Sequence, residues 1–212
     1  MIDKKRLFLF FKKINYGHEY EGDGMNYRYF HALRVLKLAN EIVQKENLSN
    51  EINLDLLWVL AIFHDIGHND ELLSKEEIKA NDRTKDIYDN QLFARYVYPL
   101  IDENKLLEEL KLVVNDFSKR EFKKLESRVV KDADDLDEIG LLNFWRMGVY
   151  AGKYHLDPQD SIDYFYQHDL SNKQQMVDKL FFDFSKKIAE QRMIEMVGLV
   201  NGFRDLNKIL NY

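Results

Sequence analysis

Two histidines and two carboxylates fall where the sequence predicts buried helix positions. His64 and Asp65 stand side by side near the end of an apolar run over 54–68, LDLLWVLAIFHDIGH. His31 lies among apolar residues at helical spacing, and Asp134 lies in a second run over 128–140, RVVKDADDLDEIG. Such groups are costly to bury without a partner, and a metal ion is the one partner that all four can share. Imidazole nitrogens combined with carboxylate oxygens suit Mn²⁺, Fe²⁺, Co²⁺, Ni²⁺ or Zn²⁺, with Mg²⁺ as a further candidate, more than Ca²⁺.

A divalent ion held by these groups is suited to cleaving a phosphate bond. Four protein ligands on an octahedral ion leave places for water and for a phosphate oxygen. The ion then polarises the phosphoryl group and lowers the pKa of water, which gives a nucleophile near neutral pH. The residue types alone predict a buried metal site and leave its use open.

Long helices are expected to position these residues. The chain has only 9 Gly and 2 Pro, which argues against a fold of many short strands. Apolar residues recur at helical spacing in several segments, and we expect helices over 1–14, 26–46, 54–68, 91–100, 103–117 and 128–140. We expect Gly67 to end the third of these, residues 141–151 to continue the last, and two or three more helices from residue 161 onward.

Polar connections separate the expected helices, and we expect loops over 16–24, 48–53, 118–126 and 152–160. Residues 69–89 are highly charged, and we interpret them as a flap beside the site with one short helix over 74–80. The chain shows no linker rich in Pro, Gly or Ser. We therefore predict a single helical domain over 1–212, with its core motifs in 26–151 and further helices in 161–212.

The composition excludes several classes of protein. The net charge of −6, with both signs scattered, gives no general attraction to nucleic acid or to an anionic membrane. The absence of Cys excludes disulfides and thiolate zinc sites. No apolar stretch is long enough to span a membrane, and we expect no signal peptide, because the apolar stretch over 7–11 is too short for one. We expect a cytoplasmic protein, and the sequence leaves open whether it forms a homodimer.

Three motifs in order resemble the HD superfamily of metal-dependent phosphohydrolases, whose pattern is H…HD…D on an all-helical fold. They are His31 in HALRV, His64-Asp65-Ile66-Gly67, and Asp132-Ala133-Asp134 with Leu136 and Gly140. The match is closest to small bacterial HD hydrolases with a DAD-x-LD-x-IG segment, some of which act on nucleoside triphosphates. The resemblance, from about Tyr27 to the end, implies an all-α helical bundle with a C-terminal helical extension. It also implies hydrolysis of a phosphorylated small molecule, and a nucleotide is the substrate that we expect.

The resemblance also implies the metal ligands, which are His31, His64, Asp65 and Asp134. Asp134 is preferred over Asp132 because the ligand of the family generally follows Ala directly in the AD-x-L pattern. Asp132 is then expected to be a supporting carboxylate that orients a histidine.

Further roles follow from the same resemblance. Asp65 and His68 are the expected catalytic residues, because His68 occupies the histidine place of the HD-x-G-H pattern and is suited to protonate a leaving oxygen or contact phosphate. Arg34 and Lys131 are expected to bind phosphate near the metal. The chain departs from the family pattern at Asp135, where Arg is usual. It departs again at residues 115–117, Asn-Asp-Phe, where many relatives carry a His.

Each motif has a structural alternative. His64 and Asp65 alone are equally well explained by the dipole at a helix end, and His31 alone by a satisfied core histidine. His68 is as well explained as a surface residue, and we expect Asp135 and Asp137 to lie on a solvated acidic face. The order of the three motifs favours the metal site. We therefore predict a phosphohydrolase that uses metal-activated water. The alternatives are a non-catalytic metal- and nucleotide-binding module, or a phosphodiesterase acting on a cyclic nucleotide or RNA.

Overall fold

A computed structural model describes residues 2–20, 24–69, 72–73 and 90–210. The architecture is all-α, as the sequence predicts, with one pair of two-residue strands near the N-terminus. The elements are α1 (Lys4–Asn15), β1 (Glu19–Tyr20), β2 (Gly24–Met25), α2 (Tyr27–Lys45), α3 (Leu54–Phe63), η1 (Ile66–His68), η3 (Phe93–Val97), η4 (Tyr98–Leu100), α6 (Asn104–Ser118), α7 (Leu125–Glu138), α8 (Leu141–Lys153), α9 (Pro158–Tyr164), η5 (Phe165–Asp169), α10 (Leu170–Lys179) and α11 (Asp183–Leu210).

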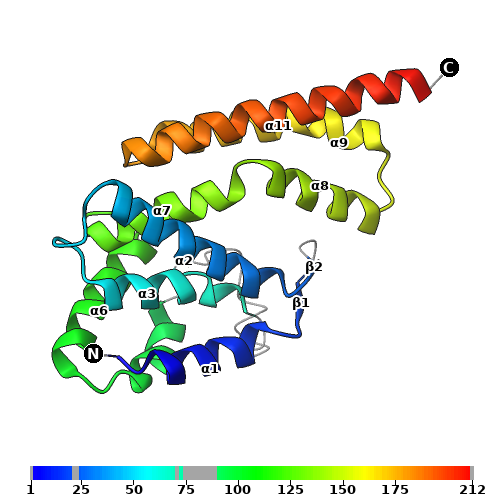
Figure 1. Cartoon of the computed structure of the whole chain (residues 1–212). Coiled ribbons are helices and arrows are strands. Elements are labelled where there is room, and N and C mark those ends of the chain that lie inside the picture. Colours follow the sequence, from blue (N-terminus) through cyan, green and yellow to red (C-terminus); the bar gives the residue numbers. More distant parts are fainter. Residues whose placement is uncertain (1, 21–23, 70–71, 74–89, 211–212) are drawn as a thin grey trace.

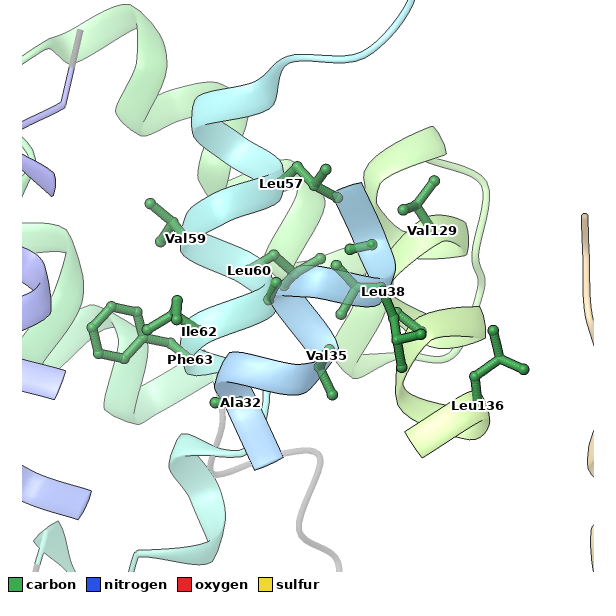
Figure 2. Packing of buried hydrophobic residues seen from close by; sticks show 14 of the residues in the cluster. Ala32, Val35, Leu38, Leu57, Val59, Leu60, Ile62, Phe63, Val129 and Leu136 are labelled. Carbon is green, nitrogen blue, oxygen red and sulfur yellow. The ribbon is translucent and has the colours of Figure 1, made fainter. Parts of the chain in front are cut away.

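Three helices form the centre of the fold. α2 packs most extensively against α7 and next against α3, and α1 and α6 cover this group (Figure 1). α8, α9 and the long α11 form a layer on the other side of α7. Figure 2 shows the apolar contacts of the centre, where Val35 of α2, Leu60 of α3 and Leu136 of α7 are fully buried. Burial of these side chains fixes the three helices that carry the site.

The central helix begins and ends at well-defined turns. The Asn53 side chain accepts the backbone N–H groups of Asp55 and Leu56 at 3.0 and 3.3 Å, which caps the first turn of α3. The α-helix ends at Phe63, before the position that the sequence predicts, and not at Gly67. A tighter 3₁₀ turn, η1, follows, in which the backbone N–H of His68 donates to the carbonyl of Asp65 at 3.0 Å. This turn brings Asp65 and His68 to the same side.

Other predicted boundaries are also corrected. Residues 141–151 do not continue the preceding helix, because the chain turns at Gly140 with φ +114°. A Cβ there would lie 3.2 Å from the Cβ of Arg192, so glycine allows both the turn and the approach of α11. The helix expected over 91–100 is present, but it includes a π-helical segment followed by a 3₁₀ turn that contains Pro99. The loop predicted over 16–24 carries β1 and the start of β2, paired in antiparallel register.

Most of the segment predicted to be a flap, 69–89, lies outside the described residues, as does its predicted short helix over 74–80. Asn69 is described and buried, and its side-chain amide donates to the carbonyl of Ile14 at 2.7 Å. Within the described ranges, no helix combines the length and apolar character that a membrane crossing requires.

Candidate metal centre

His31 and His64 present the same nitrogen atom to the same point. His31 lies in the second turn of α2, His64 directly follows α3, and each residue is 3% exposed. The Nδ1 atom of His64 donates to the carbonyl of Ala61 at 2.9 Å, and that of His31 donates to Asp137 Oδ2 at 2.8 Å. These acceptors fix the tautomers, which leaves both Nε2 atoms for a ligand. The two Nε2 atoms lie 3.1 Å apart.

Asp65 and Asp134 complete the cluster. Asp134 Oδ1 lies 3.3 Å from His31 Nε2 and 3.5 Å from His64 Nε2. Asp65 approaches the same two atoms at 3.5 and 3.7 Å. Ligand atoms of His31, His64 and Asp65 all lie within 4.8 Å of one another. The structure therefore brings together all four ligands that the resemblance implies, and this set of nitrogen and oxygen donors fits one divalent cation.

The cluster attracts positive charge. Burial opposes the charged form of His31, but hydrogen bonds to Asp134 and Asp137 outweigh burial and raise the pKa of His31 to about 10. Burial likewise opposes the charged form of Asp134, but its hydrogen bonds to His31 and His64 hold its pKa well below the usual range. A field that retains protons on imidazoles also favours a divalent cation, which takes their place.

A cavity of about 460 Å³ opens beside the cluster. Its residues come from α2, the turn after α3, the end of α6, the connection after it, α7 and α8, and are Tyr27, Arg28, His31, His64, Asp65, His68, Phe117, Ser118, Arg120, Phe122, Lys131, Asp134, Glu138 and Arg146. His68 and Lys131 thus line the cavity, as expected for residues that meet a substrate. Lys131 also pairs with Asp135, one turn further along α7.

Arg28 is a cavity residue that sequence reasoning missed. Its guanidinium binds Asp65 Oδ2 at 2.5 Å and lies 3.2 Å from His68 Nδ1. Because a guanidinium only donates, the neutral form of His68 accepts at Nδ1 and carries its proton on Nε2. Arg28 lies three residues before His31, so the spacing of one helical turn was the available signal.

Two residues with predicted roles in the site, Arg34 and Asp132, bind other groups. Arg34 is not among the described residues that line the cavity. Its Nε and one terminal nitrogen donate to both carboxylate oxygens of Asp137 at 2.7 and 2.9 Å. The prediction that Asp132 orients a histidine is wrong. Its fully buried carboxylate accepts the backbone N–H groups of Phe181 and Phe182 at 2.9 to 3.1 Å.

Asp137 orients His31 instead. The expectation of a solvated face for Asp135 and Asp137 is also wrong, because each is 4% exposed. The hydrogen bonds of Asp137 with His31 and Arg34 outweigh burial and lower its pKa, so it stays ionised and keeps the His31 Nδ1–H in place.

The comparisons with known proteins agree with this geometry. A family model described as HD domain matches residues 28–139, more than half of the chain. The chain belongs to the HD domain family. The match includes His31, the His64–Asp65 pair and Asp134, the residues that meet at the cluster.

Solved structures share the fold of this HD protein. YpgQ of Bacillus subtilis, determined in complex with ADP, is 24% identical, with a TM-score of 0.58 and 96% of each chain covered. An HD-superfamily hydrolase of Bacillus thuringiensis is 22% identical, with a TM-score of 0.61 and 96% of each chain covered. A predicted HD superfamily hydrolase from an uncultured Thermotogales bacterium is 16% identical, with a TM-score of 0.63, covering 96% of this chain and 92% of that chain. No curated protein sequence matches this chain.

Proposed function

We propose that this HD protein is a metal-dependent phosphohydrolase whose substrate is a nucleotide. The observation that carries the proposal is the position of the cluster: two Nε2 atoms and two carboxylates converge beside a cavity whose walls carry cations. Bound there, a divalent cation supplies Lewis-acid activation of water and of a phosphoryl oxygen. Membership of the HD family supports the same class of reaction.

The charges of the cavity support a phosphorylated substrate. Among the described lining residues, four side chains are cationic (Arg28, Arg120, Lys131 and Arg146), against the carboxylates of Asp65, Asp134 and Glu138. Two of these carboxylates are the proposed metal ligands. Guanidinium and ammonium groups at such positions bind phosphate oxygens and offset charge that develops during cleavage.

Aromatic walls support a nucleotide rather than a smaller phosphate ester. Tyr27, Phe117 and Phe122 line the cavity. Aromatic faces of this kind are suited to bases. That the similar YpgQ structure contains ADP is a further reason to choose a nucleotide.

We assign roles to four residues beyond the imidazole ligands. Asp65 and Asp134 hold the cation, and Asp65 also orients the attacking water. The Nε2–H of neutral His68 donates a hydrogen bond to the leaving oxygen or to phosphate, because its Nε2 lies 3.7 Å from Asp65 Oδ1 and therefore beside the reacting group. Lys131 binds phosphate charge.

Two departures from the family pattern favour the non-catalytic alternative: Asp135, an acid where Arg is usual, and Asn115-Asp116-Phe117, where many relatives carry a His. Asp135 is bound to Lys131 and is not among the described residues that line the cavity, so repulsion of phosphate does not argue for that alternative.

Phosphate and pyrophosphate release from a nucleotide panel with Mn²⁺ tests the proposal. We expect release by the parent protein and a loss of more than about 100-fold in Asp65→Ala, because even partners of metal ligands contribute 10- to 100-fold. Asp102→Ala is the matched control, since its side chain is 84% exposed. Cyclic nucleotides and a short RNA belong in the panel, because turnover of these alone would indicate a phosphodiesterase. Full activity in Asp65→Ala, or a metal-loaded parent that cleaves nothing, would overturn the proposal.

A further inference from the structure

The connection between α6 and α7, residues 119–124, forms one wall of the cavity. Arg120 and Phe122 line the cavity beside Phe117 and Ser118. The neighbouring Lys119 and Lys123 are exposed and are not among the described lining residues. The sequence predicts only a polar loop over 118–126, whereas the structure places Arg120 and Phe122 of this loop in the lining of the cavity.

The backbone of this wall is strained. Arg120 has φ +54° and Phe122 has φ +49°, so two side-chain-bearing residues within three positions adopt the left-handed conformation. Such residues are uncommon because Cβ crowds the backbone, and they persist only where the surroundings fix them. Strain of this kind gathers at binding and catalytic sites.

Asp116 fixes the strained turn from inside the protein. It is 5% exposed, and its two carboxylate oxygens accept the backbone N–H groups of Lys123 and Lys124 at 2.9 Å each. Its own carbonyl accepts the backbone N–H of Glu121 at 3.1 Å. One buried residue thus binds the loop at its middle and at its end, and the charged acceptor makes these hydrogen bonds strong.

The rest of the turn is held by its aromatic residue. The Phe122 ring packs edge-on against Phe117 and tilted against Phe181, with ring centroids 5.8 Å apart in both pairs. Arg128 Nε donates to the carbonyl of Phe122 at 2.7 Å. Contacts from α6, α7 and the segment before α11 therefore define one conformation of the wall.

We propose that Arg120 binds a phosphate group of the substrate and that Asp116 is the positioning residue that aims it by holding the strained turn. The inference rests on the proposed function, because it names a further contact of the same cavity. A strained turn costs stability, so its presence here indicates a function. The residue that this turn places in the lining of the cavity is Arg120, and a guanidinium is the group best suited to pair with phosphate.

The experiment measures ADP binding in the presence of Mn²⁺ by titration calorimetry, together with KM and kcat on the best nucleotide of the panel. We expect Arg120→Ala to weaken ADP binding and raise KM by about 10-fold, with kcat within about 2-fold, as for a lost charge-assisted contact at a partly exposed position. Asp116→Asn, which keeps the size but not the two charged acceptors, has a smaller effect in the same direction. Lys119→Ala, a neighbouring cation outside the lining, leaves both values unchanged.

A double-mutant cycle separates positioning from a general effect on folding. If Asp116 acts through Arg120, Asp116→Asn produces no further loss of ADP affinity when Arg120 is already Ala. Additive losses in the double variant would overturn the role of Asp116. If Asp116→Asn does not fold, Arg120→Gly keeps the phosphate contact testable, because it removes the same guanidinium and relieves the backbone strain. It should bind ADP as weakly as Arg120→Ala while melting at or above the parent temperature.

Failure of this inference differs from failure of the proposed function. A parent protein that binds ADP and cleaves nucleotides, with Arg120→Ala equal to it in both assays, would overturn the phosphate contact and leave the phosphohydrolase standing. A parent that neither binds ADP nor cleaves any nucleotide would overturn both.

Discussion

Asp132 and Asp134 lie two residues apart on α7 and serve opposite sides of the helix. Asp132 is fully buried and accepts three hydrogen bonds from the backbone N–H groups of Phe181 and Phe182, just before α11 begins. Asp134 faces the cavity, a quarter exposed, with two imidazole nitrogens within 3.5 Å. Backbone N–H groups therefore satisfy the Asp132 carboxylate, whereas the negative charge of Asp134 faces the candidate metal site.

The difference teaches that the role of a carboxylate follows from its partner rather than from its spacing. Two residues correspond to about 200° around a helix, so neighbouring acids face different elements. Asp135 pairs with Lys131, and Asp137 binds His31 and Arg34. Four acids within six positions therefore have four kinds of partner: backbone amides, the candidate metal site, a lysine, and a histidine with an arginine.

The strongest test of this contrast is Asp134→Ala. We expect it to abolish stoichiometric metal binding, measured by elemental analysis of the purified protein, because one of two anionic ligands is lost. The helical content should stay that of the parent, since Asp134 makes its contacts within the candidate metal site rather than with the backbone. A variant that retained one metal per chain would show that Asp134 is not a ligand.

Asp132→Ala should show the reverse pattern. Its loss leaves two buried backbone N–H groups without their acceptor, and we expect the free energy of unfolding to fall by about 3 kcal/mol. Metal stoichiometry should stay that of the parent in the folded fraction. Denaturant titration measures the first value, and Asp132→Asn, which keeps one acceptor oxygen, is the matched control with a smaller loss. Metal loss at unchanged stability would return Asp132 to the ligand set.

Where helices lie was predictable from local pattern, but where they end was less so. The helices expected over 26–46 and 103–117 agree with α2 and α6 to within a residue or two, because each carries a clear apolar stripe. Residues 56–63 are all apolar, so their periodicity did not show that the α-helix stops at Phe63. The break at Gly140 depends on the approach of Arg192 from α11, a distant contact that no local pattern reports.

The same distinction holds for the candidate site. Residue type and motif order were enough to select the four cluster residues that the structure brings together. The partners of those residues were not predictable, because the Asp137 that orients His31 lies 106 positions away in the chain. Asp116 was noted only as a departure from the family pattern. Its function in the cavity wall depends on strained torsion angles, which are not visible in a sequence.

The charge of the cluster gives a further test of this contrast when a chelator has removed the metal. The folded-state pKa of His31, about 10, lies above its ordinary value of 6.5, and that of His64 is also raised because the nearby Asp65 and Asp134 outweigh burial. Between these pH values the folded protein binds more protons than the unfolded chain. The contribution of these two histidines to the free energy of unfolding of the chelated protein should therefore be complete below about pH 6.5. The free energy of unfolding should fall steadily from there towards pH 9.

Saturating Mn²⁺ should remove this decline, because metal ligation requires the neutral imidazoles that rising pH favours. Asp135 affects only the lower end of the window: burial raises its pKa to about 6, so most of its titration is finished by pH 7. Denaturant titrations at intervals between pH 6.5 and 9, with chelator and with Mn²⁺, measure both curves. If the stability of the chelated protein were level or rising across this window, the carboxylates could not hold protons on the imidazoles. The electrostatic contrast between Asp134 and Asp132 would then be wrong, even if the geometry of the cluster were right.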